Sequence, residues 1–283
     1  MKQITKLHGQ LLEGGIWDEK RQKLYFLDIE KFRIYRFSEP DKLEKLQMST
    51  YVSSIVLKKD GSLLAALQDG LYEVDFDKGS SRRVMESQFP KNIRYNDGKC
   101  DPHGDLWLGS MFVDQTEAGA EGGGSLFCIQ DGCVTAEYPS FTIPNGLDWI
   151  LEKGLFYHTE TSKKVISVYQ QETESRGKIG TKIKEIDFSQ EKGSPDGMCA
   201  DRDGNLWVAM WGGSQVIGYN PEKEQIIERI PVPDQNVSCC IFGGKEWNQL
   251  FITTARDENG NGGELYTIQL NHCGKAGYRY GER

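Results

Sequence analysis

The chain has 283 residues, a formal net charge of −8 and a sequence pI near 5.2, which argues against nucleic acid as a partner. No apolar run approaches the roughly 18 residues that a membrane-spanning helix needs, so no membrane role is expected. The seven cysteines form no Cys-x-x-Cys pair and follow no secretory signal, which predicts a reduced, cytoplasmic protein.

One pattern recurs six times along the chain: a charged or glycine-bearing turn, a leucine, and a short apolar strand. A second strand-like segment follows each of these leucines, and no stretch with helical periodicity competes. In chain order the paired segments cover residues 18–27 and 34–37, 59–67 and 70–74, 101–111 and 124–129, 149–159 and 165–169, 201–211 and 215–219, and 245–255 and 263–268.

The spacing of the repeated leucines indicates the architecture. Leu24, Leu63, Leu106, Leu155, Leu206 and Leu250 lie 39 to 51 residues apart, and propeller blades of four strands repeat at about 40 to 50 residues. The sequence therefore predicts an all-β fold: a single six-bladed β-propeller domain over residues 1–283, with four-stranded antiparallel blades around a central channel. A strand over residues 3–7 is expected to complete the last blade, because joining the chain ends hides two sheet edges.

Polar residues recur at one register before the leucines, where the innermost strand of each blade is expected. Glu13, Asn96, Asn145 and Asp196 each stand 10 or 11 residues before their leucine. Because innermost strands converge at the entrance of the channel, four blades should bring a side-chain oxygen to the same level. The other two blades offer only serines there, which leave room for a ligand.

This ring of oxygens predicts a cation site. Carboxylates gathered in a channel repel one another or lose their hydration unless a cation joins them. Oxygen ligands favour Ca²⁺, Mg²⁺ or Mn²⁺, whereas Zn²⁺ usually prefers nitrogen or sulfur. Glu13, Asn145 and Asp196 make up a minimal metal-binding set with coordination positions left open for water or substrate.

A simpler interpretation stays open for each motif. Asn-Gly and Asp-Gly pairs, as at residues 145–146 and 196–197, are common in turns. The cluster Arg94, Asn96 and Asp97 is equally compatible with a surface turn.

Six blocks in the same order resemble the family of senescence-marker protein (regucalcin), gluconolactonase and luciferin-regenerating enzyme. They are EGGIW (13–17), RYNDG (94–98), PNGLDW (144–149), PDGM (195–198), SCCIFGG (238–244) and TTAR (253–256). The resemblance implies a six-bladed propeller with a divalent cation at the channel, in a family of which many members hydrolyse sugar lactones.

The resemblance also implies roles for individual residues. It places the metal ligands on Glu13, Asn145 and Asp196, and makes Asp196 the catalytic general base as well. Arg94 and Asn96 match substrate-contacting positions and Asp97 lies beside them; Asp114 falls where some members carry a substrate-contacting glutamate. The chain departs from the family pattern at Gly15, where proline is usual, and at Glu160, where aspartate is frequent.

Together these features predict a divalent-metal-dependent hydrolase that opens sugar lactones to aldonic acids. The cation polarises the lactone carbonyl, and a water that is metal-bound or held by Asp196 attacks the carbonyl carbon. Two alternatives remain: a metal-dependent esterase or phosphotriesterase with a different pocket, and a non-enzymatic calcium-binding propeller.

Overall fold

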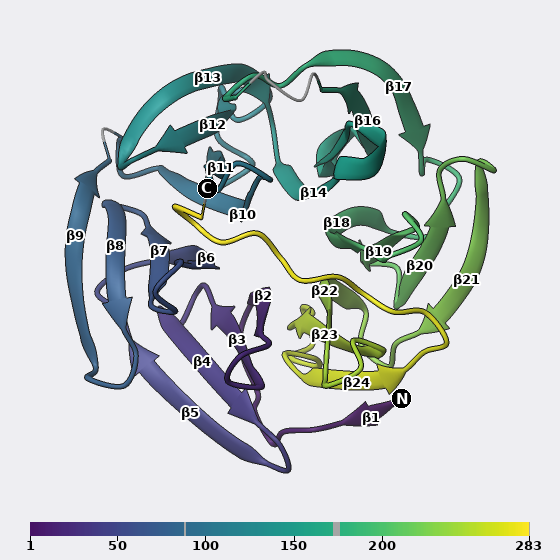
Figure 1. Ribbon diagram of the computed structural model, residues 1–283, viewed down its shortest axis with the longest axis horizontal. Helices are drawn as coiled ribbons and strands as arrows, with labels where there is room; N and C mark the ends of the chain where they lie inside the picture. The colour runs from purple at the N-terminus through teal and green to yellow at the C-terminus, as the bar shows by residue number, and fades with distance from the viewer. Residues whose placement is uncertain (88, 172–175, 283) are drawn as a thin grey trace.

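Six four-stranded antiparallel sheets surround a central channel in the computed structural model of the chain (Figure 1). The structure describes residues 1–87, 89–171 and 176–282. In each sheet one strand lies next to the channel, and the innermost strands of neighbouring blades contact each other around the ring. The six-bladed β-propeller predicted from the leucine spacing is confirmed.

Blades 1 to 5 each take four consecutive strands, running outward from the channel. Blade 1 contains β2 (Leu12–Asp18), β3 (Lys23–Asp28), β4 (Arg33–Ser38) and β5 (Lys42–Gln47); blade 2 contains β6 (Val52–Leu57), β7 (Leu63–Leu67), β8 (Gly70–Asp75) and β9 (Ser80–Glu86); blade 3 contains β10 (Ile93–Cys100), β11 (Leu106–Phe112), β12 (Gly124–Gln130) and β13 (Cys133–Phe141). Blade 4 contains β14 (Pro144–Ile150), β15 (Leu155–Glu160), β16 (Val165–Gln170) and β17 (Thr181–Asp187), with 3₁₀ turns η1 (Leu151–Lys153) and η2 (Thr161–Lys163); blade 5 contains β18 (Ser194–Ala200), β19 (Leu206–Trp211), β20 (Gln215–Asn220) and β21 (Gln225–Pro231).

Blade 6 joins the two ends of the chain. It contains β22 (Asn236–Gly243), β23 (Gln249–Ala255), β24 (Leu265–Gln269) and the N-terminal strand β1 (Lys2–Gln3) on its outer edge. The strand begins one residue earlier than predicted and ends at Gln3, although the Ile4 amide still donates to the Leu265 carbonyl at 3.0 Å. The expected closure of the ring by the N-terminus is therefore present with different bounds.

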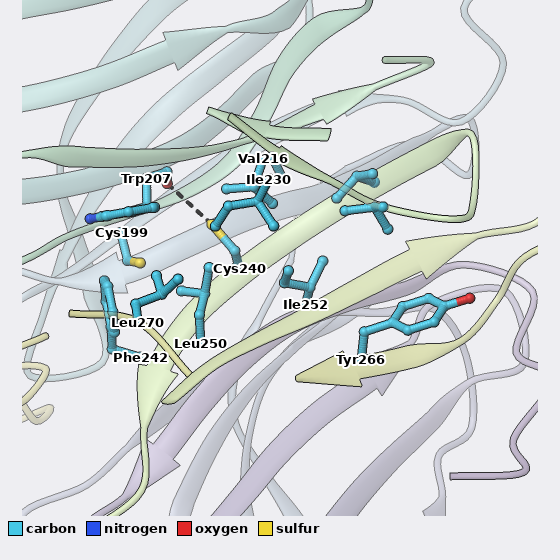
Figure 2. Close-up of a cluster of buried hydrophobic side chains, with 13 residues drawn as sticks. Cys199, Trp207, Val216, Ile230, Cys240, Phe242, Leu250, Ile252, Tyr266 and Leu270 are labelled. Carbon is cyan, nitrogen blue, oxygen red and sulfur yellow. Dashed lines mark hydrogen bonds between the residues drawn. The ribbon is translucent and has the colours of Figure 1, made fainter. Parts of the chain in front are cut away.

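The repeated leucines begin or nearly begin the second strand of each blade and pack between neighbouring sheets. Figure 2 shows one such core, where Trp207 of β19 and Phe242 of β22 lie with Leu250 between blades 5 and 6. Its dashed line marks the thiol of Cys240 donating to the Trp207 carbonyl at 3.2 Å. Burying these side chains supplies about 1.5–3 kcal/mol each, which makes the blade-to-blade cores the main support of the channel.

A C-terminal strap, residues 271–282, crosses one end of the channel (Figure 1). It contacts all six blades through hydrogen bonds. These join Gly274 to Trp247, Cys273 to Arg202, Lys275 to Trp149, Gly281 to Gly104, Tyr280 to Leu57 and Arg279 to Glu19. The strap therefore closes the channel at the end opposite the starts of the innermost strands.

Candidate functional site

A β-bulge interrupts the pairing of every innermost strand at the same level of the channel. The register with the second strand shifts between residues 13 and 16, 52 and 54, 95 and 98, 144 and 147, 195 and 198, and 237 and 239. Asn96, Asp97, Asn145 and Asp196 lie inside these bulges, and Glu13 lies directly before one. Because a bulge re-aims side chains, it can turn several polar groups toward one point.

Strand β10 shows what the bulge does. In a regular strand, side chains alternate between the two faces, so Asp97 would point away from the face that carries Arg94 and Asn96. Tyr95 and Cys100 both pack in the same hydrophobic cluster although they lie five residues apart, which requires a change of phase between them. The bulge supplies that change and allows both halves of the strand to present polar side chains to the channel.

Two glycines let the innermost strands approach closely at this level. A Cβ at Gly146 would lie 2.4 Å from the Asp196 carbonyl oxygen, and one at Gly197 would lie 2.8 Å from the Ser238 carbonyl oxygen. The Asn-Gly and Asp-Gly pairs thus lie within β14 and β18 rather than in turns. Their glycines permit close backbone packing, which brings Asn145 and Asp196 together.

The three predicted metal ligands are all buried and come from three blades. Glu13, Asn145 and Asp196 are 8%, 6% and 4% exposed. The Asn145 amide donates a hydrogen bond to the Asp196 carboxylate, and it also contacts the Thr161 hydroxyl at 3.2 Å. Glu13 accepts from the Gly14 amide at 2.9 Å.

Burial and like charge raise the pKa of both channel carboxylates. Burial, and then the nearby Asp97, raise the pKa of Glu13 to about 8, although the Gly14 amide and Arg94 act against this. Burial, Glu13 and Asp97 hold the pKa of Asp196 well above its ordinary value. Ionising both groups side by side therefore costs free energy, and a divalent cation placed between them would offset that cost.

Arg94 and Asn96 form a buried hydrogen-bonded unit. The Arg94 guanidinium donates to the Asn96 side-chain oxygen at 2.9 Å and to the Tyr95 carbonyl at 2.8 Å. The Asn96 amide in turn donates to the Pro144 carbonyl at 2.9 Å, immediately before Asn145. This unit ties blade 3 to blade 4 next to the carboxylates.

Asp97 and Asp114, the other two predicted substrate-binding residues, occupy different environments. Asp97 is half-buried and accepts from the Gly98 amide at 2.7 Å. Burial raises its pKa, with Lys99 and the Gly98 amide acting in the opposite direction. Asp114 is exposed on the loop after β11, where Thr116 donates to its carboxylate through the amide at 2.9 Å and the hydroxyl at 2.7 Å. The structure does not bring Asp114 into the buried group.

The two departures from the family pattern have local explanations. A Cβ at Gly15 would lie 2.9 Å from the Ile241 side chain, so Ile241 fills space that a proline ring would need. Glu160 is buried and accepts from the amides of Thr142 and Ile143, both at 2.9 Å. Glu160 therefore holds the segment that leads into Asn145.

Sequence reasoning missed a second group of charged side chains deeper in the channel. The Lys99 ammonium donates to the Asp148 carboxylate at 3.0 Å, and Lys275 of the strap lies 3.4 Å from the other oxygen of that carboxylate. These residues line a cavity of about 60 Å³ between the candidate ligands and the strap, together with Asp97. Asp148 lies in the PNGLDW block and Lys99 directly follows RYNDG, so these blocks were a signal. Regular alternation conceals which of their residues reach the channel, because each bulge changes the phase of its strand.

A separate group of potential metal ligands lies near the strap. Atoms of Asp201, Asp203 and His272 all lie within 4.8 Å of one another. However, one oxygen of Asp201 already accepts from Asn205 at 2.9 Å and from the Trp207 indole at 3.0 Å. Asp201 therefore serves the turn between β18 and β19.

The described part of the chain contains no helix that is long and apolar enough to cross a membrane.

Comparisons with known proteins agree with the fold. Residues 11–256 match the model of the SMP-30/Gluconolactonase/LRE-like region. The chain is 32% identical to pentonolactonase XacC of Haloferax volcanii over 260 residues, covering 90% of this chain and 85% of the relative. It is 31% identical to regucalcin of Sus scrofa over 249 residues, covering 87% and 83%. A solved structure of luciferin-regenerating enzyme superposes with a TM-score of 0.87 at 26% identity, covering 96% of both chains. The chain belongs to the SMP-30/gluconolactonase/LRE-like family.

Proposed function

We propose that this protein is a divalent-metal-dependent hydrolase that opens sugar lactones to aldonic acids. The observation that carries the proposal is the meeting of Glu13, Asn145 and Asp196, from three blades, in one buried group beside Arg94 and Asn96. The family name includes gluconolactonase, and the relative from Haloferax volcanii is named a pentonolactonase. Both names support a lactone as the substrate class.

The chemistry of the donor set fits a hard divalent cation. Two carboxylates and one amide supply oxygen ligands, and the raised pKa values of Glu13 and Asp196 indicate negative charge that is poorly compensated. In the structure the amide nitrogen of Asn145 faces Asp196. Rotation of the amide group by half a turn would place its oxygen there instead, as a ligand for the cation. When bound, the cation would supply Lewis-acid polarisation of the lactone carbonyl.

Asp196 has the role of orienting the hydrolytic water. Its carboxylate is buried beside Asn145. The water adds its oxygen to the lactone carbonyl carbon, the ring C–O bond breaks, and the released alkoxide takes up a proton to give the hydroxy acid. A cation bound to the Asp196 carboxylate would lower its pKa, so Asp196 orients the water more than it takes up a proton, and the proton that the water gives up passes to the alkoxide.

Arg94, Asn96 and Asp97 would hold the sugar. The Arg94 guanidinium has five N–H donors, of which Tyr95 and Asn96 engage one nitrogen, so other donors are available for substrate oxygens. Asp97 can accept a hydrogen bond from a ring hydroxyl. Asp114 is proposed to contact substrate only through movement of its exposed loop.

The test is acid release from a panel of aldonolactones. The protein is first treated with a chelator and then supplied with Ca²⁺, Mg²⁺, Mn²⁺ or Zn²⁺ separately. We expect chelation to abolish hydrolysis and at least one ion to restore it, and Asp196→Ala to remain folded but inactive. Hydrolysis that continues unchanged after chelation, or full activity of the variant, would contradict the proposal.

A further inference from the structure

We propose that Lys99 is a positioning residue that holds the carboxylate of Asp97 in place for substrate. This inference rests on the proposed function, since it concerns how the same site is held. It starts from Lys99, Asp148 and Lys275, the charged side chains between the candidate ligands and the C-terminal strap that have no part in the proposed chemistry.

Lys99 and Asp97 are placed together by the backbone. Asp97 lies inside the bulge of β10, and Lys99 follows it by two residues, just past the end of the bulge. The Lys99 charge acts to lower the pKa of Asp97, so the two side chains are within electrostatic reach of each other. Both line the cavity beneath the candidate ligands, and both are partly buried. An ammonium at this place attracts the Asp97 carboxylate toward the cavity wall.

Lys99 is itself held rigidly. Its ammonium donates to the Asp148 carboxylate at 3.0 Å and to the Met198 carbonyl at 3.1 Å. Asp148 is fixed by the amides of Trp149 at 2.8 Å and Ala200 at 2.9 Å. Two blades besides blade 3 thus fix the position of the Lys99 charge.

The charges around the cavity show why Lys99 is more than a partner for Asp148. Asp148 has a second lysine, Lys275, which lies 3.4 Å away and also donates to the Trp149 carbonyl. The charged side chains that line the cavity are two lysines and two aspartates. Asp148 is one carboxylate beside two ammonium groups, and Asp97, two residues from Lys99 along the strand, is the other carboxylate on the cavity wall.

Lys275 provides a matched control for this idea. The side chains of Lys99 and Lys275 are 23% and 25% exposed, and both pair with Asp148. Lys275 belongs to the strap and is not adjacent to Asp97 in β10. A merely structural role for the cavity charges would make the two lysines equivalent, whereas a positioning role would make them different.

The kinetic experiment compares Lys99→Met, Lys99→Arg and Lys275→Met with D-glucono-1,5-lactone as substrate. We expect Lys99→Met to raise KM about tenfold or more while kcat changes less, which is the loss expected for one charge-assisted hydrogen bond to substrate. Lys99→Arg should restore most of the loss. Lys275→Met should lower the melting temperature but leave KM unchanged. Equal effects of the two methionine variants on KM, or none from Lys99→Met, would overturn the inference.

A crystallographic readout separates this inference from the proposed function. Wild type, Lys99→Met and Lys275→Met would be crystallised with Mn²⁺ and the position of the Asp97 carboxylate compared. We expect the carboxylate to move only in Lys99→Met. If wild type opens no lactone, the proposed function fails, while this comparison still decides whether Lys99 positions Asp97; an unmoved Asp97 in Lys99→Met rejects the positioning role.

Discussion

The Asn145 amide donates a hydrogen bond to the Asp196 carboxylate across the boundary between blades 4 and 5. Thr161 strengthens this boundary, because its hydroxyl donates to the Pro195 carbonyl at 2.8 Å while lying 3.2 Å from the Asn145 amide. Two bulged strands are thereby held in register at the level of the candidate ligands. The contact matters because it compensates part of the charge that Glu13 places next to Asp196.

Asp196→Asn should separate metal binding from folding. Replacing the carboxylate removes the like-charge repulsion with Glu13, so the metal-free variant should be at least as stable as wild type near pH 7. Loss of one anionic ligand should weaken Mn²⁺ binding by about 100-fold, or about 3 kcal/mol. Calorimetric titration with Mn²⁺ and urea unfolding in chelator measure the two effects. Asp203→Asn, at an exposed acid near the strap, serves as the control; unchanged Mn²⁺ affinity in Asp196→Asn would refute the ligand assignment.

In the metal-free protein, the contribution of Glu13 to stability should be lost as the pH rises from about 4.5 to about 8. The pKa of Glu13 is raised from 4.5 to about 8 by burial and Asp97, so the folded state retains a proton that the unfolded chain releases. This contribution should fall by at most about 1.4 kcal/mol per pH unit across this window. Urea unfolding of wild type and Glu13→Gln in chelator at pH 5, 6, 7 and 8 measures it as the difference between the two slopes, which removes the effects of the other titrating groups. Equal slopes would be evidence against a Glu13 that keeps its proton in the folded protein.

Arg94→Lys should impair substrate binding although it keeps the positive charge. A lysine ammonium lacks the planar fork that bonds to Tyr95 and Asn96 while leaving donors free for substrate. We expect KM to rise about tenfold or more, the cost of losing a hydrogen bond to a charged group. Steady-state kinetics measure the change, with Arg82→Lys on an exposed strand as control. Wild-type KM in Arg94→Lys would show that the guanidinium geometry is not used.

Deleting residues 1–8 should destabilise the ring. The deletion removes the pairing of β1 with β24, the packing of Ile4 and Leu7 against the core, and the 2.6 Å contact between His8 and Glu264. Partial burial of two aliphatic side chains and the lost hydrogen bonds together suggest a loss of about 3 kcal/mol. Urea unfolding of the deletion variant and of the exposed-site control Lys6→Ala measures this. Equal stability of the deletion variant and full-length protein would show that closure does not depend on the N-terminus.

His158 should make the protein sensitive to acid. The side chain is 1% exposed, neither ring nitrogen has a hydrogen-bond partner among the described residues, and burial lowers its pKa from 6.5 to about 3. Its contribution to stability is complete above pH 6.5 and is lost as the pH falls toward 3, by about 1.4 kcal/mol per pH unit. His158→Phe, which suits the neighbouring rings of Phe141 and Phe156, should reduce this slope between pH 6.5 and 4 in urea unfolding, whereas the control His103→Gln should not. An unchanged slope in His158→Phe would place the acid sensitivity elsewhere.

The sequence by itself determined the blade count and the level of the candidate ligands. A leucine that packs against the core of every blade repeats at blade length, so counting back from it locates Glu13, Asn145 and Asp196 on the innermost strands without knowledge of their contacts. This works because each blade repeats one local pattern of turn and strand. The sequence could not show that the Asn-Gly pair at residues 145–146 and the Asp-Gly pair at residues 196–197 lie in bulges, because the same pairs are common in turns.

Only the tertiary structure decided which other side chains reach the channel. Alternation along a regular strand would place Arg94 and Lys99 on opposite faces, and the bulge in β10 reverses that phase. The bulge depends on close packing between neighbouring innermost strands, which no local sequence pattern encodes. Lys275 arrives from a strap without periodicity, through contacts with residues more than 120 positions earlier. The cavity and its charged lining are therefore consequences of long-range packing.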